Sequence, residues 1–281
     1  MNDQILLSMN NIFKSYSKND VLRGISLILN AGECVGIVGK NGSGKTTLLR
    51  IISGLLLHFF GCLKTYGNII SALIETPTFI NEFTGRENIK YLLDKKHQSR
   101  AIEMLKSLDV NEYLDKPTRA YSQGMRQKLA LSIVFARNAD IILLDEPFNS
   151  VDIQSSNRII EILNNYKNQN KGIIVVTHNI SKIDTYCDKI LLLEDGILKI
   201  SNKTNDFDQQ KYQIGFLSNN DFLLAQSLLS GYTLNADKTA ENTLIVTFPK
   251  GSLSIILKKL SNCNITNIIE IKTDLTGEKN V

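Results

Sequence analysis

The chain has 281 residues, of which 43% are hydrophobic and 21% are charged, and its formal net charge is +4 at pH 7. These values are typical of a globular protein with one large domain, or with a domain and an appendage. The basic residues form only short pairs such as Lys95-Lys96, which argues against nucleic-acid binding. The four cysteines are far apart and form no CxxC pair, which argues against a zinc site and a disulfide scaffold.

No signal peptide or membrane span is expected. The first seven residues lack a basic start and an apolar run. The most apolar stretch, Leu55–Leu63, is interrupted by His58 and is too short to cross a bilayer. If the protein serves a membrane, we expect it to act from the cytoplasmic side through a partner.

In chain order, the first 200 residues mix strands and helices. The expected strands occupy residues 5–12, 25–29, 34–38, 141–144 and 172–177, with a hairpin at 190–200 around Asp195-Gly196. A helix is expected over 46–53, and the pattern from 84 to 134 is mostly helical. Pro117 breaks this helical run, and a new helix is expected to begin near Ser122.

A second, smaller domain is predicted at the C-terminal end. Residues 201–211 are polar with few aliphatics, which indicates a linker. Strand-like and helix-like segments then alternate over 212–217, 221–229, 243–248, 253–260 and 265–272. This order is typical of a small α+β domain at 212–281, and a ferredoxin-like fold would suit it.

The segment GKNGSGKTT between the strand at 34–38 and the following helix matches a phosphate-binding loop. Its glycines let the backbone approach an anion, and the helix start adds its positive end. Lys45 would place a charge between the β- and γ-phosphates, and Thr46 would offer its hydroxyl to Mg²⁺. The candidate nucleotide-binding residues are Gly39, Lys40, Asn41, Gly42, Ser43, Gly44, Lys45, Thr46 and Thr47.

Two acids end the apolar strand at 141–144. Because adjacent strand residues point to opposite sides, Asp145 is expected to face the magnesium and Glu146 the γ-phosphate. Glu146 could then take a proton from the attacking water. His178 follows the strand at 172–177 and is placed to touch the γ-phosphate beside Glu146.

The segment Tyr121-Ser122-Gln123-Gly124-Met125-Arg126-Gln127-Lys128 resembles the signature motif of the ATP-binding cassette (ABC) family. The order phosphate loop, signature, acidic strand and histidine is also similar to that family. The resemblance covers residues 1 to about 200. It implies an α/β P-loop NTPase core of ABC type with an antiparallel β subdomain and a helical subdomain at about 84–134.

The resemblance further implies a head-to-tail dimer, either of two copies or with a different cassette. ATP and Mg²⁺ would lie between one phosphate loop and the partner's signature, so that Ser122 and Gly124 reach the neighbour's γ-phosphate. Tyr16 aligns with the aromatic residue that stacks on adenine. Asp152 aligns with the loop after the acidic strand that communicates across the dimer.

One departure from the family pattern concerns Glu75, which stands where the family usually has glutamine. Glutamate offers only acceptors, yet it could still hold the magnesium or its water. Glutamate here, with the segment at 83–88 and the C-terminal appendage, resembles the bacitracin-resistance and lantibiotic-immunity transporters.

These expectations describe an ATPase at the cytoplasmic face of a membrane that powers a separate integral membrane permease. The resemblance implies an antimicrobial or amphipathic peptide as cargo, expelled through the permease. Two other classes stay open: a soluble ABC ATPase without transport, and a cassette whose C-terminal domain senses peptide. The chain carries no heptad run and no basic tail, which favours the transporter.

Overall fold

The computed structural model describes residues 4–17, 19–75, 78–180, 183–200, 209–229, 233–236, 242–249 and 253–271. The chain divides into two compact units, Met1–Ser201 and Asn202–Val281, and each is described by itself. Most of the expected linker, residues 201–208, lies outside the described residues, as do residues 272–281.

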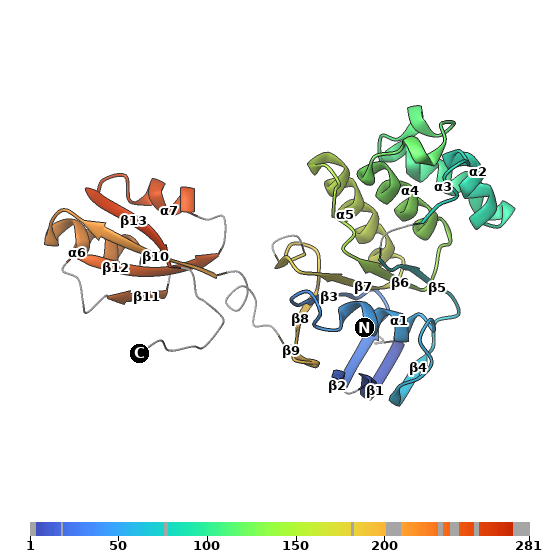
Figure 1. Cartoon of the computed structure of the whole chain (residues 1–281), viewed down its shortest axis with the longest axis horizontal. Coiled ribbons are helices and arrows are strands. Elements are labelled where there is room, and N and C mark those ends of the chain that lie inside the picture. Colours follow the sequence, from blue (N-terminus) through green and yellow to red (C-terminus); the bar gives the residue numbers. More distant parts are fainter. Residues whose placement is uncertain are drawn as a thin grey trace. The chain divides into compact units, whose positions relative to one another are not determined.

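A six-stranded sheet forms the centre of the first unit (Figure 1). Its order is β5 (Ile70–Leu73), β6 (Ile141–Asp145), β7 (Gly172–Thr177), β3 (Cys34–Val38), β8 (Lys189–Glu194) and β9 (Ile197–Ile200). The pairs from β5 to β8 are parallel, and β8 and β9 form the expected antiparallel hairpin. Every residue of β3, β6 and β7 is buried, as expected for parallel strands covered on both faces.

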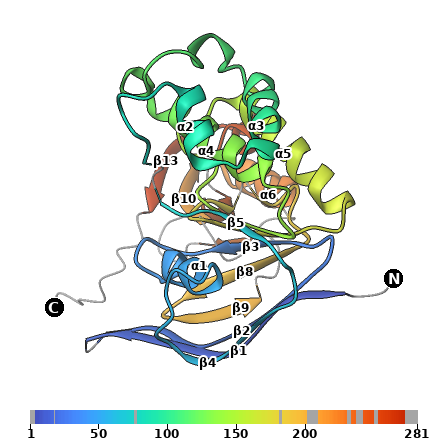
Figure 2. The same cartoon turned by 90° about the vertical axis from the view of Figure 1, so that its right-hand side faces the viewer.

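A three-stranded antiparallel sheet lies below α1 in Figure 2. Its order is β2 (Asn19–Asn30), β1 (Ile5–Tyr16) and β4 (Phe60–Thr65). Helix α1 (Lys45–Ile52) packs between this sheet and the central one, and its Leu48 and Ile51 share a core with Ile25 of β2 and Ile37 of β3. This shared core fixes the start of α1, and with it the phosphate loop, against both sheets.

The opposite face of the central sheet carries the helical part of the unit (Figures 1 and 2). Its helices are α2 (Gly85–Leu92), α3 (Lys95–Ser107), α4 (Gln123–Ala136) and α5 (Ile153–Asn168), with short 3₁₀ turns at Asn111–Tyr113 and Thr118–Ala120. A capping box between Thr84 and Glu87 begins α2. Pro117 separates α4 from the preceding helices, as the sequence predicts. No helix within the described ranges combines the length and apolar character needed to cross a bilayer.

The second unit has the element order β10 (Gln209–Phe216), α6 (Asn219–Leu228), β11 (Thr233–Ala236), β12 (Thr243–Pro249), α7 (Leu253–Lys259) and β13 (Ile265–Ile271). Its four strands pair antiparallel in the order β11-β12-β10-β13. This βαββαβ arrangement is the ferredoxin-like fold that the sequence suggested. Strand β11 was not predicted, because four residues without clear alternation give no periodic signal.

Candidate nucleotide and magnesium site

The phosphate loop joins β3 to α1. Gly42 and Gly44 have φ values of 82° and 103°, a region that favours glycine. Gly39 has no room for a side chain, because a Cβ there would meet the carbonyl oxygen of Leu193. The buried Lys45 ammonium donates to the carbonyl oxygens of Gly39 at 2.6 Å and Lys40 at 2.9 Å. Burial lowers the pKa of Lys45, while the nearby Glu146 and Asp145 act in the opposite direction.

The loop fits a bound phosphate group. The Ser43 hydroxyl is buried and has no hydrogen-bond partner among the residues that the structure describes. Buried polar groups are usually hydrogen-bonded, so this hydroxyl is available to a bound phosphate. No atom of the described residues lies within 4 Å of a Cβ placed at Gly42, and Lys40 and Asn41 are exposed beside it. The first turn of α1, which contains Thr46 and Thr47, directs its backbone N–H groups to the same side.

The expected magnesium ligands Thr46 and Asp145 lie together. The Thr46 hydroxyl donates to Asp145 Oδ2 at 2.9 Å, across 99 residues of chain. Burial raises the pKa of Asp145, whereas the hydrogen bond from Thr46 acts against that rise. A hydroxyl and a carboxylate are hard oxygen donors of the kind Mg²⁺ takes when phosphates complete its shell, so this pair fits the ion.

Glu75, the third expected metal ligand, forms an ion pair with Arg50 of α1. The Glu75 side chain is half exposed, and its backbone has a left-handed φ of 63°. Residues 76–77, which follow it, lie outside the described residues. A role for Glu75 at the metal stays a prediction, and Arg50 is a partner that the sequence reasoning missed.

Glu146 lies at the centre of a hydrogen-bonded group. Its carboxylate accepts from the Thr177 hydroxyl at 2.9 Å and from the backbone N–H of His178 at 2.8 Å, and its Oε1 lies 2.5 Å from His178 Nδ1. The expectation that strand alternation aims Glu146 was wrong, because β6 ends at Asp145 and Glu146 adopts a left-handed φ of 48°. Thr177 was also missed, because nothing in the sequence marks its hydroxyl as a partner of Glu146.

The signature segment begins α4, as expected. Ser122 is the N-cap residue, and its hydroxyl accepts from the backbone N–H of Met125 at 3.2 Å. Gly124 lies so close to the loop after β6 that a Cβ there would collide with the carbonyl oxygen of Ser150. The signature therefore contacts the loop that follows Glu146 within the same chain.

Asp152 and Tyr16 have contacts that the sequence did not predict. Asp152 caps α5, accepting from the backbone N–H of Ser155 at 2.8 Å and forming a 2.7 Å ion pair with Lys128. Tyr16 ends β1 and is 43% exposed, with the Lys14 ammonium 4.8 Å from its ring centroid. An adenine-stacking role for Tyr16 and a cross-dimer role for Asp152 stay predictions.

A phosphate loop between a parallel strand and a helix, with an acid pair at the end of β6, two strands away in the same sheet, defines a P-loop nucleoside triphosphatase. The family model for the ABC transporter matches residues 22–149. The O-antigen export system ATP-binding protein RfbB of Klebsiella pneumoniae is 32% identical over 184 residues, which cover 63% of this chain and 75% of that protein. The chain belongs to the ABC transporter family.

Other relatives extend this comparison. The teichoic acids export ATP-binding protein TagH of Lactococcus lactis is 32% identical over 195 residues, covering 66% of this chain and 42% of that protein. An O-antigen export system ATP-binding protein of Myxococcus xanthus is 32% identical over 191 residues, covering 66% of this chain and 44% of that protein. The chain thus spans less than half the length of these two relatives.

Solved structures agree on the fold. One titled as the ATP binding subunit of an ABC transporter covers 91% of this chain and 99% of its own, with a TM-score of 0.65 at 21% identity. An ATP-binding cassette dimer, bound to ADP and Pi in a post-hydrolysis state, covers 72% of this chain and 100% of its own, with a TM-score of 0.64 at 25% identity. The expected ABC-type fold, the ATPase class, and ATP and Mg²⁺ as its ligands are confirmed at the level of the family.

Proposed function

We propose that this chain is the ATP-hydrolysing subunit of a membrane transporter. Two cassettes, identical or different, close head-to-tail on two ATP molecules, and closure drives a separate integral membrane permease from its cytoplasmic face. The observation that carries the proposal is the convergence of Lys45, Thr46, Asp145 and Glu146 at one end of the central sheet. Electrostatic positioning of this kind supplies most of the catalysis in phosphoryl transfer.

Each side chain in this group has a proposed role. Lys45 binds the β- and γ-phosphates, while Thr46 and Asp145 hold Mg²⁺, which neutralises the charge that develops on the phosphates. Glu146 accepts the proton of the attacking water, and His178 orients Glu146 and contacts the γ-phosphate. The hydrogen bonds from Thr177 and His178 support this assignment, because they fix both carboxylate oxygens of Glu146.

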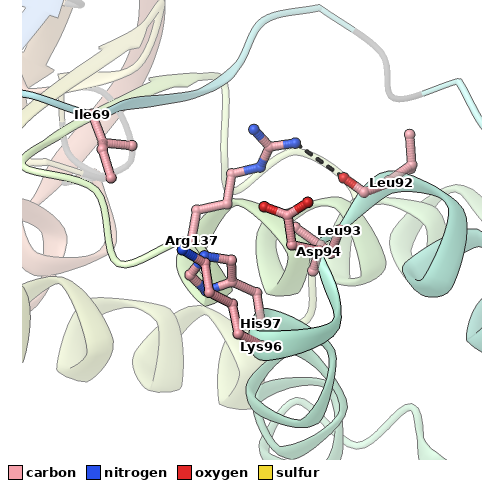
Figure 3. Close-up of a pocket in the computed structure, with 7 residues that line it drawn as sticks. All are labelled: Ile69, Leu92, Leu93, Asp94, Lys96, His97 and Arg137. Carbon is pink, nitrogen blue, oxygen red and sulfur yellow. Dashed lines mark hydrogen bonds between the residues drawn. The ribbon is translucent and has the colours of Figure 1, made fainter.

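The permease is proposed to dock on the helical part of the cassette. Two observations support this surface. Tyr91 is 69% exposed on α2 and packs edge-on against the exposed Phe83, and exposed aromatic residues are common at protein interfaces. A pocket of about 260 Å³ also opens beside α2 and α3 (Figure 3). It is lined by Ile69, Leu92, Leu93, Asp94, Lys96, His97 and Arg137.

Two cargo classes follow from different observations. Glu75 and the segment at 83–88 resemble peptide-expelling transporters, which gives a peptide as the first candidate. The matched relatives do not support this candidate, since their names refer to the export of O-antigen and of teichoic acids. These names favour a second candidate, an O-antigen or a teichoic acid. For the ferredoxin-like unit we propose a docking or dimer-stabilising role.

The test is to purify the chain from detergent-solubilised membranes with an affinity tag and to measure ATP turnover of what is recovered. A transporter subunit should bring down an integral membrane protein with several spans, and turnover should depend on Mg²⁺. Added amphipathic peptide should stimulate the complex if peptide is the cargo, and teichoic acid or O-antigen should do so in the second case. Recovery of an active ATPase with no membrane partner would instead favour a soluble ABC machine.

A further inference from the structure

The first two turns of α4 contact the loop after β6 through three residues. Gly124, Gln127 and Lys128 are spaced i, i+3 and i+4, so they lie on one face of the helix. Gly124 packs against the Ser150 carbonyl, and Gln127 Nε2 donates to the Glu146 carbonyl oxygen at 3.3 Å. The helix that begins with the signature is thus attached to the loop that begins with Glu146.

The third contact is the ion pair between Lys128 and Asp152. Lys128 Nζ lies 2.7 Å from Asp152 Oδ2, and its side chain is only 11% exposed. Asp152 also accepts from the backbone N–H and the hydroxyl of Ser155 at the start of α5. The hydrogen bond from Lys128 is the main reason that the pKa of Asp152 lies far below its usual range. Lys128 therefore joins α4, the end of the loop and α5 at one point.

The loop itself has a strained backbone. Glu146 and Ser150 both adopt left-handed conformations, with φ values of 48° and 61°. Residues other than glycine keep such conformations only where the surrounding structure holds them. The Glu146 carbonyl accepts from Asn149 N–H at 3.1 Å and from Gln127, so α4 supplies part of the support that keeps the loop in this shape.

We propose that Lys128 is a positioning residue for ATP hydrolysis, acting through Asp152 to hold the loop 146–152 in the shape that aims Glu146. The same contact links Glu146 of one site to Ser122 and Gly124, which serve the partner's site in the proposed dimer. This inference rests on the proposed function. In the proposed site Lys128 touches neither nucleotide nor metal, and it acts on hydrolysis only through Asp152.

The test compares Lys128→Met with Lys128→Arg and with a matched control, Lys167→Met. Lys167 forms an ion pair with Asp188 at the same 2.7 Å distance, with side chains 18% and 46% exposed against 11% and 56% for the Lys128 pair. The control thus removes a similar ion pair, together with the 3.2 Å hydrogen bond from Lys167 to the Tyr186 carbonyl, and neither contact is made with a residue of the loop 146–152. Steady-state ATP turnover, binding of a fluorescent ATP analogue and thermal melting are measured for each variant.

We expect Lys128→Met to lower kcat about 10- to 100-fold, because a base displaced by about 1 Å loses that much rate. Analogue affinity should stay within about twofold of wild type, since the lost effect is confined to the transition state. Lys128→Arg should have most of the wild-type kcat, and Lys167→Met should have a kcat equal to that of the wild type. A Lys128→Met enzyme with wild-type kcat, or a Lys167→Met enzyme that loses as much, would overturn the inference.

Asp152→Asn provides the second arm, and it carries the test alone if Lys128→Met does not fold. Asparagine keeps the N-cap, so the variant removes the ion pair with little change at α5. We expect a similar loss of kcat, and no further loss in the double variant, because both changes break one link. Full activity of Asp152→Asn, or additive losses, would refute the link. Absence of Mg²⁺-dependent turnover in the wild-type chain would refute the proposed function instead.

Discussion

Replacing Glu146 by glutamine separates the binding of ATP from its hydrolysis. Glutamine has the same shape, and its amide oxygen can still accept from the backbone N–H of His178, which lies 2.8 Å from Glu146 Oε1. Its NH₂ group can face Thr177, whose hydroxyl accepts as well as donates. The site should therefore keep its structure, although the hydrogen bonds that Thr177 and His178 make with the charged carboxylate become weaker, neutral ones.

What the variant loses is the group that takes a proton. Loss of a general base lowers the rate by about 10²–10⁴-fold, which corresponds to about 3–5 kcal/mol in the activation barrier. Phosphate release at saturating ATP measures the rate, and titration of a fluorescent ATP analogue measures the affinity. The control is Glu194→Gln. It makes the same chemical change on β8, where Glu194 forms an ion pair with the exposed Lys199. Wild-type turnover by Glu146→Gln would refute the assignment of Glu146 as the base.

Three further predictions concern the loop, the signature and the N-cap of α5. Lys45→Ala should weaken binding of the ATP analogue about 10- to 100-fold in the same titration, because a charge-assisted contact is lost. Gly124→Ala should lower the free energy of unfolding in urea by about 1–3 kcal/mol, because the new methyl group meets the Ser150 carbonyl. Asp152→Asn should lower the free energy of unfolding by about 0.5–1 kcal/mol at pH 7, because the ion pair with Lys128 is lost. The folded-state pKa of Asp152 is depressed, so the ionised carboxylate contributes stability above its unfolded pKa. The difference from wild type in urea unfolding should shrink as pH falls below about 4.

The parts of the site that the sequence predicted are those that depend on short segments of chain. The phosphate loop needs a strand, a glycine-rich turn and a helix in succession, and β3 and α1 supply them within 19 residues, Cys34–Ile52. Ser122 was expected to begin a helix because a hydroxyl before a helical run is a local capping signal. For the same reason five of the six elements of the second unit could be inferred from alternating patterns, whereas the short β11 was missed.

The parts that the sequence did not predict depend on contacts between distant segments or on unusual backbone angles. Arg50 and Glu75 are 25 residues apart, and no periodic pattern links a helix residue to a loop that follows a strand. The direction of Glu146 depends on a left-handed φ, which the strand alternation used to predict it does not include. Asp152 was assigned by resemblance to communication across the dimer, but its cap and its ion pair with Lys128 appear only in three dimensions.

The order of strands in the central sheet explains how these separate pieces form one site. Strand β7 lies between β6 and β3, so its end separates the acid pair from the phosphate loop. Thr177 at that end contacts both: its carbonyl accepts from Gly39 N–H at 3.3 Å, and its hydroxyl donates to Glu146. Because parallel strands bring their carboxyl ends to one edge, Gly39, Glu146 and His178 meet there. The chemistry therefore depends on the sheet order as much as on the motifs.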